Sequence, residues 1–189
     1  MTARDKLVYG TIDLMQRRGV SAAGLTEILE HSNVSRRSVY LNFPGGKPEL
    51  VAAATTAAGA WITAQIQRSC ENDDPFAAVS DFVGQWKSML GGSDFAAGCP
   101  VTAAAMARSV APAAAEQAGI VFETWHSVLA ETLERHGVSG SRAASLANMI
   151  VAAVEGAVLM AVAQQSMTAL TDVEEELHAL LSSVVPSRG

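Results

Sequence analysis

Residues 25–50 read LTEILEHSNVSRRSVYLNFPGGKPEL, and this stretch decides the fold class. Apolar side chains recur at helical spacing on both sides of a short polar segment, which predicts a helix over 25–31, a turn over 32–34 and a second helix from 35 to 42. Asn33 suits the left-handed conformation of a tight turn, and Ser35 is a typical helix N-cap. Two short helices joined by such a turn make a helix-turn-helix.

The second helix of this motif has two different faces. Ile28 and Leu29 are predicted to face inward from the first helix, with Val34 filling the turn and Val39 anchoring the second helix. The side chains left mostly outward are Arg36, Arg37, Ser38, Tyr40 and Asn42. A helix presented in this way fits the major groove of DNA, where arginine can bind guanine and asparagine can bind adenine.

The rest of the chain is also predicted to be helical. Further helices are expected over 2–18, 47–70, 75–90, 100–108, 112–136, 141–165 and 172–185, and no confident strand is visible. Thr171 and Glu174 form a capping-box pattern for the last helix. We therefore predict an all-α fold of about nine helices, with a helix-turn-helix domain over 1–46 and a helical ligand-binding and dimerisation domain over 47–189.

Composition and charge agree with this division. Hydrophobic residues make up 49% of the 189 residues and charged residues 17%, which suits a sizeable core. The formal net charge is −6, but residues 1–50 hold seven Lys/Arg against five Asp/Glu, a local net charge of +2. Because only this first part carries a net positive charge, it is the only part predicted to bind a polyanion.

Several classes of protein are disfavoured. Cys70 and Cys99 are too few for a disulfide framework, and no secretory signal is visible at the N-terminus. The longest apolar stretch, 149–163, is interrupted by Glu155 and Gly156 and is shorter than the roughly 20 residues of a membrane span. We therefore expect a cytoplasmic protein.

The stretch 25–50 resembles the N-terminal signature of the tetracycline-repressor (TetR/AcrR) family. The resemblance covers roughly residues 4–55 and rests on the Val-Ser turn, the Tyr-x-x-Phe ending and the following Lys with Glu-Leu. It implies that Tyr40 and Lys47 hold phosphates, that Arg36 and Arg37 lie near bases, and that the last two helices form a dimer. It also implies a ligand cavity in the C-terminal part. The expected DNA contacts are Ser35, Arg36, Arg37, Ser38, Tyr40, Asn42 and Lys47.

The sequence leaves some of these roles open. Gly24 stands where many family members have a capping threonine, which puts one phosphate contact in doubt. Arg36 and Arg37 can each contact phosphate instead of a base, and Tyr40 can instead belong to the core. Arg4, Arg17 and Arg18 are expected on the solvated surface.

A dimer interface is predicted on the last two helices, where small and apolar residues permit close helix packing. The expected interface residues are Ala153, Gly156, Ala157, Ala161, Leu177, Leu180, Leu181 and Val184. The alternative is that these faces pack within one subunit.

An effector site is expected among the C-terminal helices, because such sites are apolar and carry few polar groups. Its candidate residues are Trp61, Gln65, Phe82, Trp86, Met89, Met106, Phe122, Trp125, His126 and Met149. Each tryptophan can stack on a flat aromatic ligand or serve as ordinary core. The segment Gly98-Cys-Pro-Val101 resembles a branch of these regulators linked to drug efflux and aromatic inducers.

The function predicted from the sequence is a repressor that binds a palindromic operator as a homodimer and is released by a small apolar or aromatic effector. No catalytic pattern, cofactor motif or metal-ligand spacing stands out, so we expect neither an enzyme nor a cofactor. The alternative is a redox-sensing regulator that uses Cys99, which precedes Pro100 at a predicted helix start.

Overall fold

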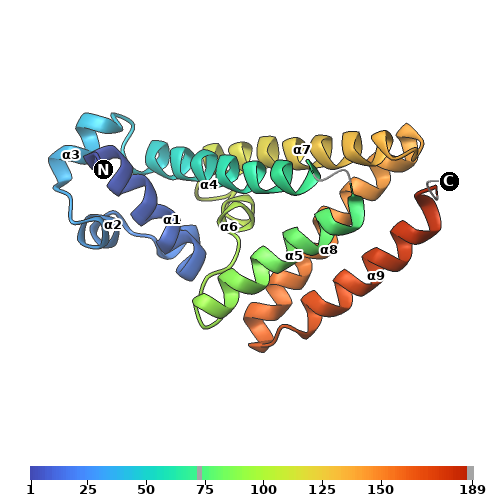
Figure 1. Ribbon diagram of the computed structural model, residues 1–189. Helices are drawn as coiled ribbons and strands as arrows, with labels where there is room; N and C mark the ends of the chain where they lie inside the picture. Colours follow the sequence, from blue (N-terminus) through green and yellow to red (C-terminus); the bar gives the residue numbers. More distant parts are fainter. Residues whose placement is uncertain (72–73, 187–189) are drawn as a thin grey trace. The chain divides into compact units, whose positions relative to one another are not determined.

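The computed structural model describes residues 1–71 and 74–186. Every regular element in these residues is a helix, which confirms the all-α prediction (Figure 1). The helices are α1 (Ala3–Ala22), α2 (Leu25–Ser32), α3 (Arg36–Asn42), α4 (Lys47–Cys70), α5 (Pro75–Gly92), α6 (Pro100–Met106), α7 (Pro112–Arg135), α8 (Gly140–Gln164) and α9 (Thr168–Val184).

The first helix is interrupted after Arg18, where the predicted range 2–18 ends. Gly19 there has φ 74° and ψ 170°, a non-helical conformation that glycine adopts without steric cost. A short further helical stretch follows, and α1 (Ala3–Ala22) covers both stretches across this kink.

The last helix begins four residues before its predicted start. It starts at Thr168, and the Ser166 hydroxyl accepts the Thr168 N–H at 3.2 Å. The predicted capping box of Thr171 and Glu174 is therefore wrong. Glu174 instead binds Lys87 of α5, with 2.8 Å between Nζ and Oε2.

The chain divides into two compact units, each with its own packing. The first holds residues 1–61 and 97–121, and the second begins at 62–96 and resumes at 122. The helix-turn-helix therefore shares a compact unit with α6, with the start of α7 and with the first part of α4. The predicted boundary at residue 46 stays a prediction.

Two close helix contacts hold the first unit together around its core. The main-chain N–H of Gly98, just before α6, donates to the carbonyl of Gln16 in α1 at 3.0 Å. Gly59 of α4 lies against the Val121 side chain of α7, which occupies the place where a Cβ on Gly59 would lie. The core beneath α2 and α3 consists of Leu7, Val8, Leu14, Ala23, Ile28, Val39, Phe43 and Leu50.

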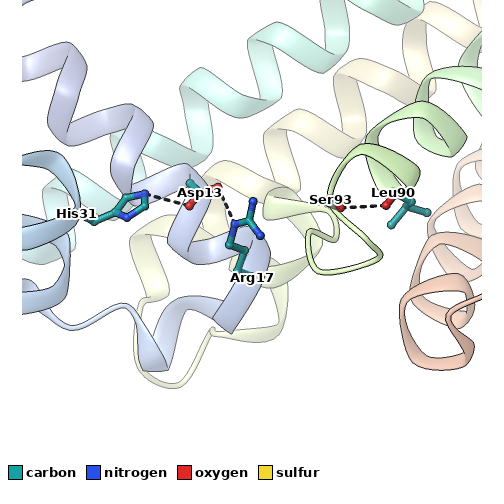
Figure 2. Close-up of polar contacts among 5 residues, drawn as sticks. All are labelled: Asp13, Arg17, His31, Leu90 and Ser93. Carbon is teal, nitrogen blue, oxygen red and sulfur yellow. Dashed lines mark hydrogen bonds and ion pairs between the residues drawn. The ribbon is translucent and has the colours of Figure 1, made fainter.

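The second unit is built from α5, α8 and α9, which pack against one another, and from the adjoining parts of α4 and α7. The Trp125 indole, fully buried, donates to the Thr63 hydroxyl at 2.9 Å. At the end of α5 the Ser93 hydroxyl donates to the Leu90 carbonyl at 3.2 Å, as Figure 2 shows. The same carbonyl accepts the Phe95 N–H at 2.8 Å, so main chain and side chain together close the end of α5.

Helix α8 is the one helix in the described residues that is long and apolar enough to cross a membrane. The prediction from the sequence counted only the shorter stretch 149–163, whereas the whole helix covers 25 residues. One face of α8 is nevertheless core, because it is buried within the chain. The buried residues are Ala143, Leu146, Ala147, Ile150, Val154, Ala157, Val158 and Ala161.

The ion pair between Lys87 and Glu174 is expected to make a pH-dependent contribution to the free energy of unfolding. Burial raises the pKa of Glu174, but hydrogen bonds from Lys87 and Ser80 and the Lys87 charge outweigh it, so the pKa lies below its ordinary value of 4.5. The pair therefore stabilises the folded state above pH 4.5, and this contribution is lost as the pH falls through the folded pKa. Because both side chains are partly exposed, we expect the ion pair to contribute about 0.5 kcal/mol to the free energy of unfolding.

Urea unfolding of Glu174→Gln checks this expectation. The variant should be less stable than wild type at pH 7, and the difference should shrink as the pH falls through the lowered folded pKa of Glu174, below which both states carry a neutral side chain. Glu175→Gln is the matched control, since Glu175 is exposed and forms no ion pair in the described residues. A difference that stays constant with pH would show that packing, not charge, holds Glu174.

Candidate DNA-binding site and effector domain

The position of α3 is fixed by its buried face and by the turn that precedes it. Ile28 of α2 and Val39 of α3 are both fully buried. Asn33 is left-handed as predicted, with φ 50° and ψ 50°, and the Ser35 hydroxyl accepts the Ser38 N–H at 3.3 Å as the N-cap of α3. Local chemistry and core packing therefore present α3 at the surface in one defined orientation.

The outward face of α3 carries two arginines. Arg36 and Arg37 are exposed, and neither forms an ion pair within the described part of the chain. Tyr40 is 50% exposed and therefore is not a core residue. A positive charge without a local carboxylate remains available for a phosphate or for the acceptor edge of a base.

Two of the predicted DNA contacts are engaged within the helix itself. The Asn42 side-chain amide donates to the Ser38 carbonyl at 2.8 Å. The Ser38 hydroxyl lies 3.0 Å from that of Ser35. Asn42 and Ser38 are also half-buried, so Arg36, Arg37, Tyr40 and Ser35 form the more accessible part of the predicted set.

Tyr40 lies beside the turn that leads into α4. A Cβ on Gly46 would be 3.4 Å from Cε1 of the Tyr40 ring, and Gly46 has φ +71°. The next residue, Lys47, is half-buried at the first position of α4. Tyr40 therefore lies against the residue that directly precedes Lys47, the other residue to which the family resemblance gives a phosphate contact.

Arg17 and Arg18, outside α3, are paired with carboxylates. Figure 2 shows Asp13 of α1 accepting from Arg17 Nε at 2.9 Å and from His31 Nε2 of α2 at 3.0 Å. Arg18 lies 3.0 Å from Glu27, whose second oxygen accepts the Gly24 N–H at 3.3 Å. Glu27 therefore supplies its own half of a capping box by binding the Gly24 N–H, whereas no side chain at Gly24 caps the N–H groups of the first turn.

Eight of the ten predicted effector residues lie in the second unit. Trp61 and Met106 belong to the first unit and are 53% and 82% exposed. Met149 is 42% exposed, whereas Gln65 and Met89 are partly buried. The remaining candidates are aromatic, and they form two groups.

The first aromatic group lies in α5. Phe82 and Trp86 are buried and meet edge to face, with ring centroids 6.4 Å apart. The Trp86 indole N–H is buried, and no acceptor bonds it within the described residues. Leaving a buried donor unsatisfied costs about 1–3 kcal/mol, so the Trp86 N–H is a site where a bound acceptor would stabilise the domain.

The second aromatic group borders a groove between α7 and α8. Phe122 and Trp125 meet edge to face at 5.2 Å, and His126 Nε2 donates to the Ala144 carbonyl at 3.1 Å. The groove encloses about 290 Å³ and is mostly apolar. Its lining residues are Phe122, His126, Asn148, Val151, Ala152 and Glu155.

A larger, more polar groove of about 760 Å³ lies at the C-terminal ends of α4 and α7. It is lined by Gln67, Cys70, Glu71, Val128, Glu131, Thr132, Glu134 and Arg135. Its charged lining fits an apolar or aromatic effector less well than the α7–α8 groove does.

Half of the predicted dimer residues are already covered by the chain itself. Ala157, Ala161, Leu177 and Leu181 are all at most 3% exposed. Of the rest, Ala153, Leu180 and Val184 are partly buried and Gly156 is exposed. Apolar and small residues that remain exposed on α8 form a second face, called here the exposed α8 face: Met149, Ala152, Gly156, Leu159, Met160 and Ala163.

The two cysteines do not have the character of redox sensors. Burial raises the pKa of the Cys70 thiol, against a hydrogen bond with Thr132 and the charge of Arg135 that lower it. Cys99 is only 7% exposed. Because a reactive sensor thiol is accessible and has a lowered pKa, the redox alternative is not supported. The described residues also contain no group of three or more potential metal ligands.

Sequence comparisons identify both parts of the chain. Residues 7–54 match the family "Bacterial regulatory proteins, tetR family", and residues 75–176 match "Transcriptional regulator LmrA/YxaF-like, C-terminal domain". The uncharacterized HTH-type transcriptional regulator Rv0196 of Mycobacterium tuberculosis is 30% identical over 98% of this chain and 97% of its own. The HTH-type transcriptional regulator LmrA of Bacillus subtilis is 26% identical over 95% and 96%.

Solved structures show the same fold. The regulatory protein TetR from Rhodobacter sphaeroides has a TM-score of 0.84 at 20% identity, covering 93% of this chain and 96% of its own. A TetR-family transcriptional regulator from Agrobacterium tumefaciens has a TM-score of 0.83 at 20% identity, covering 97% and 98%.

The chain belongs to the TetR family of bacterial transcriptional regulators. Within that family its C-terminal domain is of the LmrA/YxaF-like type. Members of the family are soluble DNA-binding regulators rather than enzymes, and they act as dimers with small-molecule effectors.

Proposed function

We propose that this regulator is a cytoplasmic repressor, that it binds a palindromic operator as a homodimer, and that a small apolar or aromatic effector releases it. The observation that carries the DNA-binding part is the outward face of α3, with two exposed guanidinium groups that form no ion pair with residues 1–71 or 74–186. Phosphate contacts supply affinity, and contacts to base edges supply specificity.

The dimer is proposed to form through the exposed α8 face. Leu159 and Met160 are 65% and 50% exposed, which is unusual for large apolar residues on a long helix. Ala152, Gly156 and Ala163 on the same face are small, so a second helix can approach closely. Gly156 has nothing within 4 Å of the place where a Cβ would lie. Of the eight interface residues predicted from the sequence, this proposal keeps only Gly156.

The effector is proposed to bind in the groove between α7 and α8. Two of the ten residues predicted from the sequence, Phe122 and His126, line it. Its volume of about 290 Å³ is close to the lower end of the range for small-molecule sites. The Trp86 indole N–H is buried with no acceptor among the described residues, so it is a second candidate contact in this domain for an effector that carries a hydrogen-bond acceptor.

Coupling between effector and DNA is proposed to pass through α6. This helix packs on α1 and is tied to it by the bond from Gly98 to Gln16, so a shift of α6 would move the helix-turn-helix. The effector must bind the DNA-incompetent state more tightly than the competent one, because equal affinity for both states shifts nothing.

A fluorescence-anisotropy titration against the DNA that flanks its own gene tests the proposal. We expect tight, sequence-specific binding that weakens as the salt concentration rises, with two chains on each palindromic site by sedimentation. Aromatic compounds that bind the protein should then release it from this DNA. Leu159→Glu should give a monomer with a greatly weakened affinity, because each half-site alone has fewer contacts.

Negative results separate the parts of the proposal. If selection from random DNA recovers no sequence, the DNA-binding claim fails. If a site is bound but Leu159→Glu stays dimeric, the exposed α8 face is not the interface. If an effector binds equally well to the DNA-bound and the free protein, it cannot be the inducer.

A further inference from the structure

Leu41 is an exposed apolar residue on the helix that otherwise presents polar groups. It is 70% exposed, more than Tyr40 beside it. The core side of α3 is already supplied by Val39 and Phe43, which are 0% and 1% exposed. Leu41 therefore does not hold the fold together, and in the free protein its side chain remains in water.

Leu41 also lies at the centre of the outward face of α3. A helix advances about 100° per residue, so residues two positions before and after Val39 both point roughly away from it. These residues are Arg37 and Leu41, which are one turn apart and share a face. The part of α3 that would enter a groove most deeply thus combines one guanidinium group and one isobutyl group.

The four base pairs present different surfaces to such a pair of side chains. In the major groove only thymine carries an apolar group, its 5-methyl, whereas the other bases present donors and acceptors. A leucine placed against a donor or an acceptor would remove water from that group without replacing its hydrogen bond. Against a methyl group it loses nothing polar and buries apolar surface on both partners.

We propose that Leu41 contacts the 5-methyl group of a thymine in each operator half-site and thereby contributes to sequence specificity. This inference rests on the proposed binding of α3 to operator DNA. The outward face of α3 would then recognise DNA through two kinds of contact. Leu41 selects thymine, while Arg37, one turn away, contacts a neighbouring base or phosphate.

Replacement of thymine by deoxyuridine tests the contact directly, because it removes the methyl group and leaves base pairing intact. The operator is first recovered from random DNA, and each thymine is then replaced in turn, symmetrically in both half-sites. At one position we expect affinity to fall about fourfold for each methyl removed, or roughly 15-fold for the symmetric pair.

The variant Leu41→Ala completes the test. It should bind the thymine operator more weakly than wild type, and it should bind the thymine and deoxyuridine operators equally well at that position. Leu41 is exposed, so the fold should be kept, which an unchanged melting temperature verifies. Ile120→Ala is the matched control, since Ile120 is an aliphatic side chain 55% exposed on α7, and it should keep the full response to deoxyuridine.

Other outcomes would overturn the inference in distinguishable ways. If Leu41→Ala weakens binding to all sequences alike and no deoxyuridine replacement has an effect, Leu41 packs on the sugar-phosphate backbone instead. If Leu41→Ala retains the response to deoxyuridine, another residue reads the methyl group. If no operator is recovered at all, the proposed repressor function fails, and the inference fails with it.

Discussion

Replacing Gly59 by alanine should destabilise the first unit by about 2 kcal/mol, although alanine is the better helix former. A Cβ at this position would lie 2.9 Å from Cγ1 and 3.1 Å from Cβ of Val121, and it would overlap Cγ2. Valine is branched at Cβ and has one strongly preferred rotamer in a helix, so it cannot turn away. The helices α4 and α7 would have to separate at this crossing.

Two further variants isolate this cause. Gly119→Ala on α7 is the control, because Gly119 is exposed and has nothing within 4 Å of its Cβ position. It should stabilise by about 0.5–1 kcal/mol through helix propensity alone. Val121→Ala should make room for the new methyl group, so the double variant should recover most of the loss in urea unfolding. Equal losses with and without Val121 would refute the steric explanation.

The parts of the fold that depend on local chemistry were predictable from the sequence. Ile28 and Val39 were expected inside because of helical periodicity, and both are fully buried. Asn33 and Ser35 were expected to shape the turn, and their backbone and side-chain contacts agree. These features depend on a few neighbouring residues, so distant parts of the chain do not alter them.

Features that depend on a tertiary partner were not predictable in the same way. Periodicity shows that a helix has an apolar face, but it does not show which neighbour covers it. Ala157 and Leu177 were predicted to lie in a dimer interface, and both are buried within a single chain. Glu174 was assigned to a cap and instead binds Lys87, a residue 87 positions earlier in the chain.

The candidate DNA-binding surface contains residues that were predictable from the sequence and residues that were not. Arg36 and Arg37 were identified from their residue type and spacing, and they are exposed. Asn42 was expected outward by the same reasoning, but its amide bonds the backbone of its own helix. Leu41 was not singled out, because an apolar residue in a helix is normally interpreted as core, and only its exposure in the structure indicates another role.

Removing both arginines of α3 is expected to have the largest effect on DNA binding. Arg36→Ala with Arg37→Ala should weaken operator binding at least 100-fold, since a good base contact contributes about 1–3 kcal/mol and a dimer loses each contact twice. Neither arginine forms an ion pair within the described residues, so the fold should not change. Anisotropy titrations at several salt concentrations would measure the loss.

The two single variants then decide which arginine reads a base. A base reader, when replaced by alanine, should relax the preference for one base pair and leave the salt dependence nearly unchanged. A phosphate contact should weaken binding to all sequences and reduce the slope of log K against log salt by about one per contact. Arg17→Ala is the control, because the Arg17 guanidinium is paired with Asp13 on α1 and should have little effect. A double variant that binds its operator as well as wild type would exclude the outward face of α3 as the DNA-binding surface.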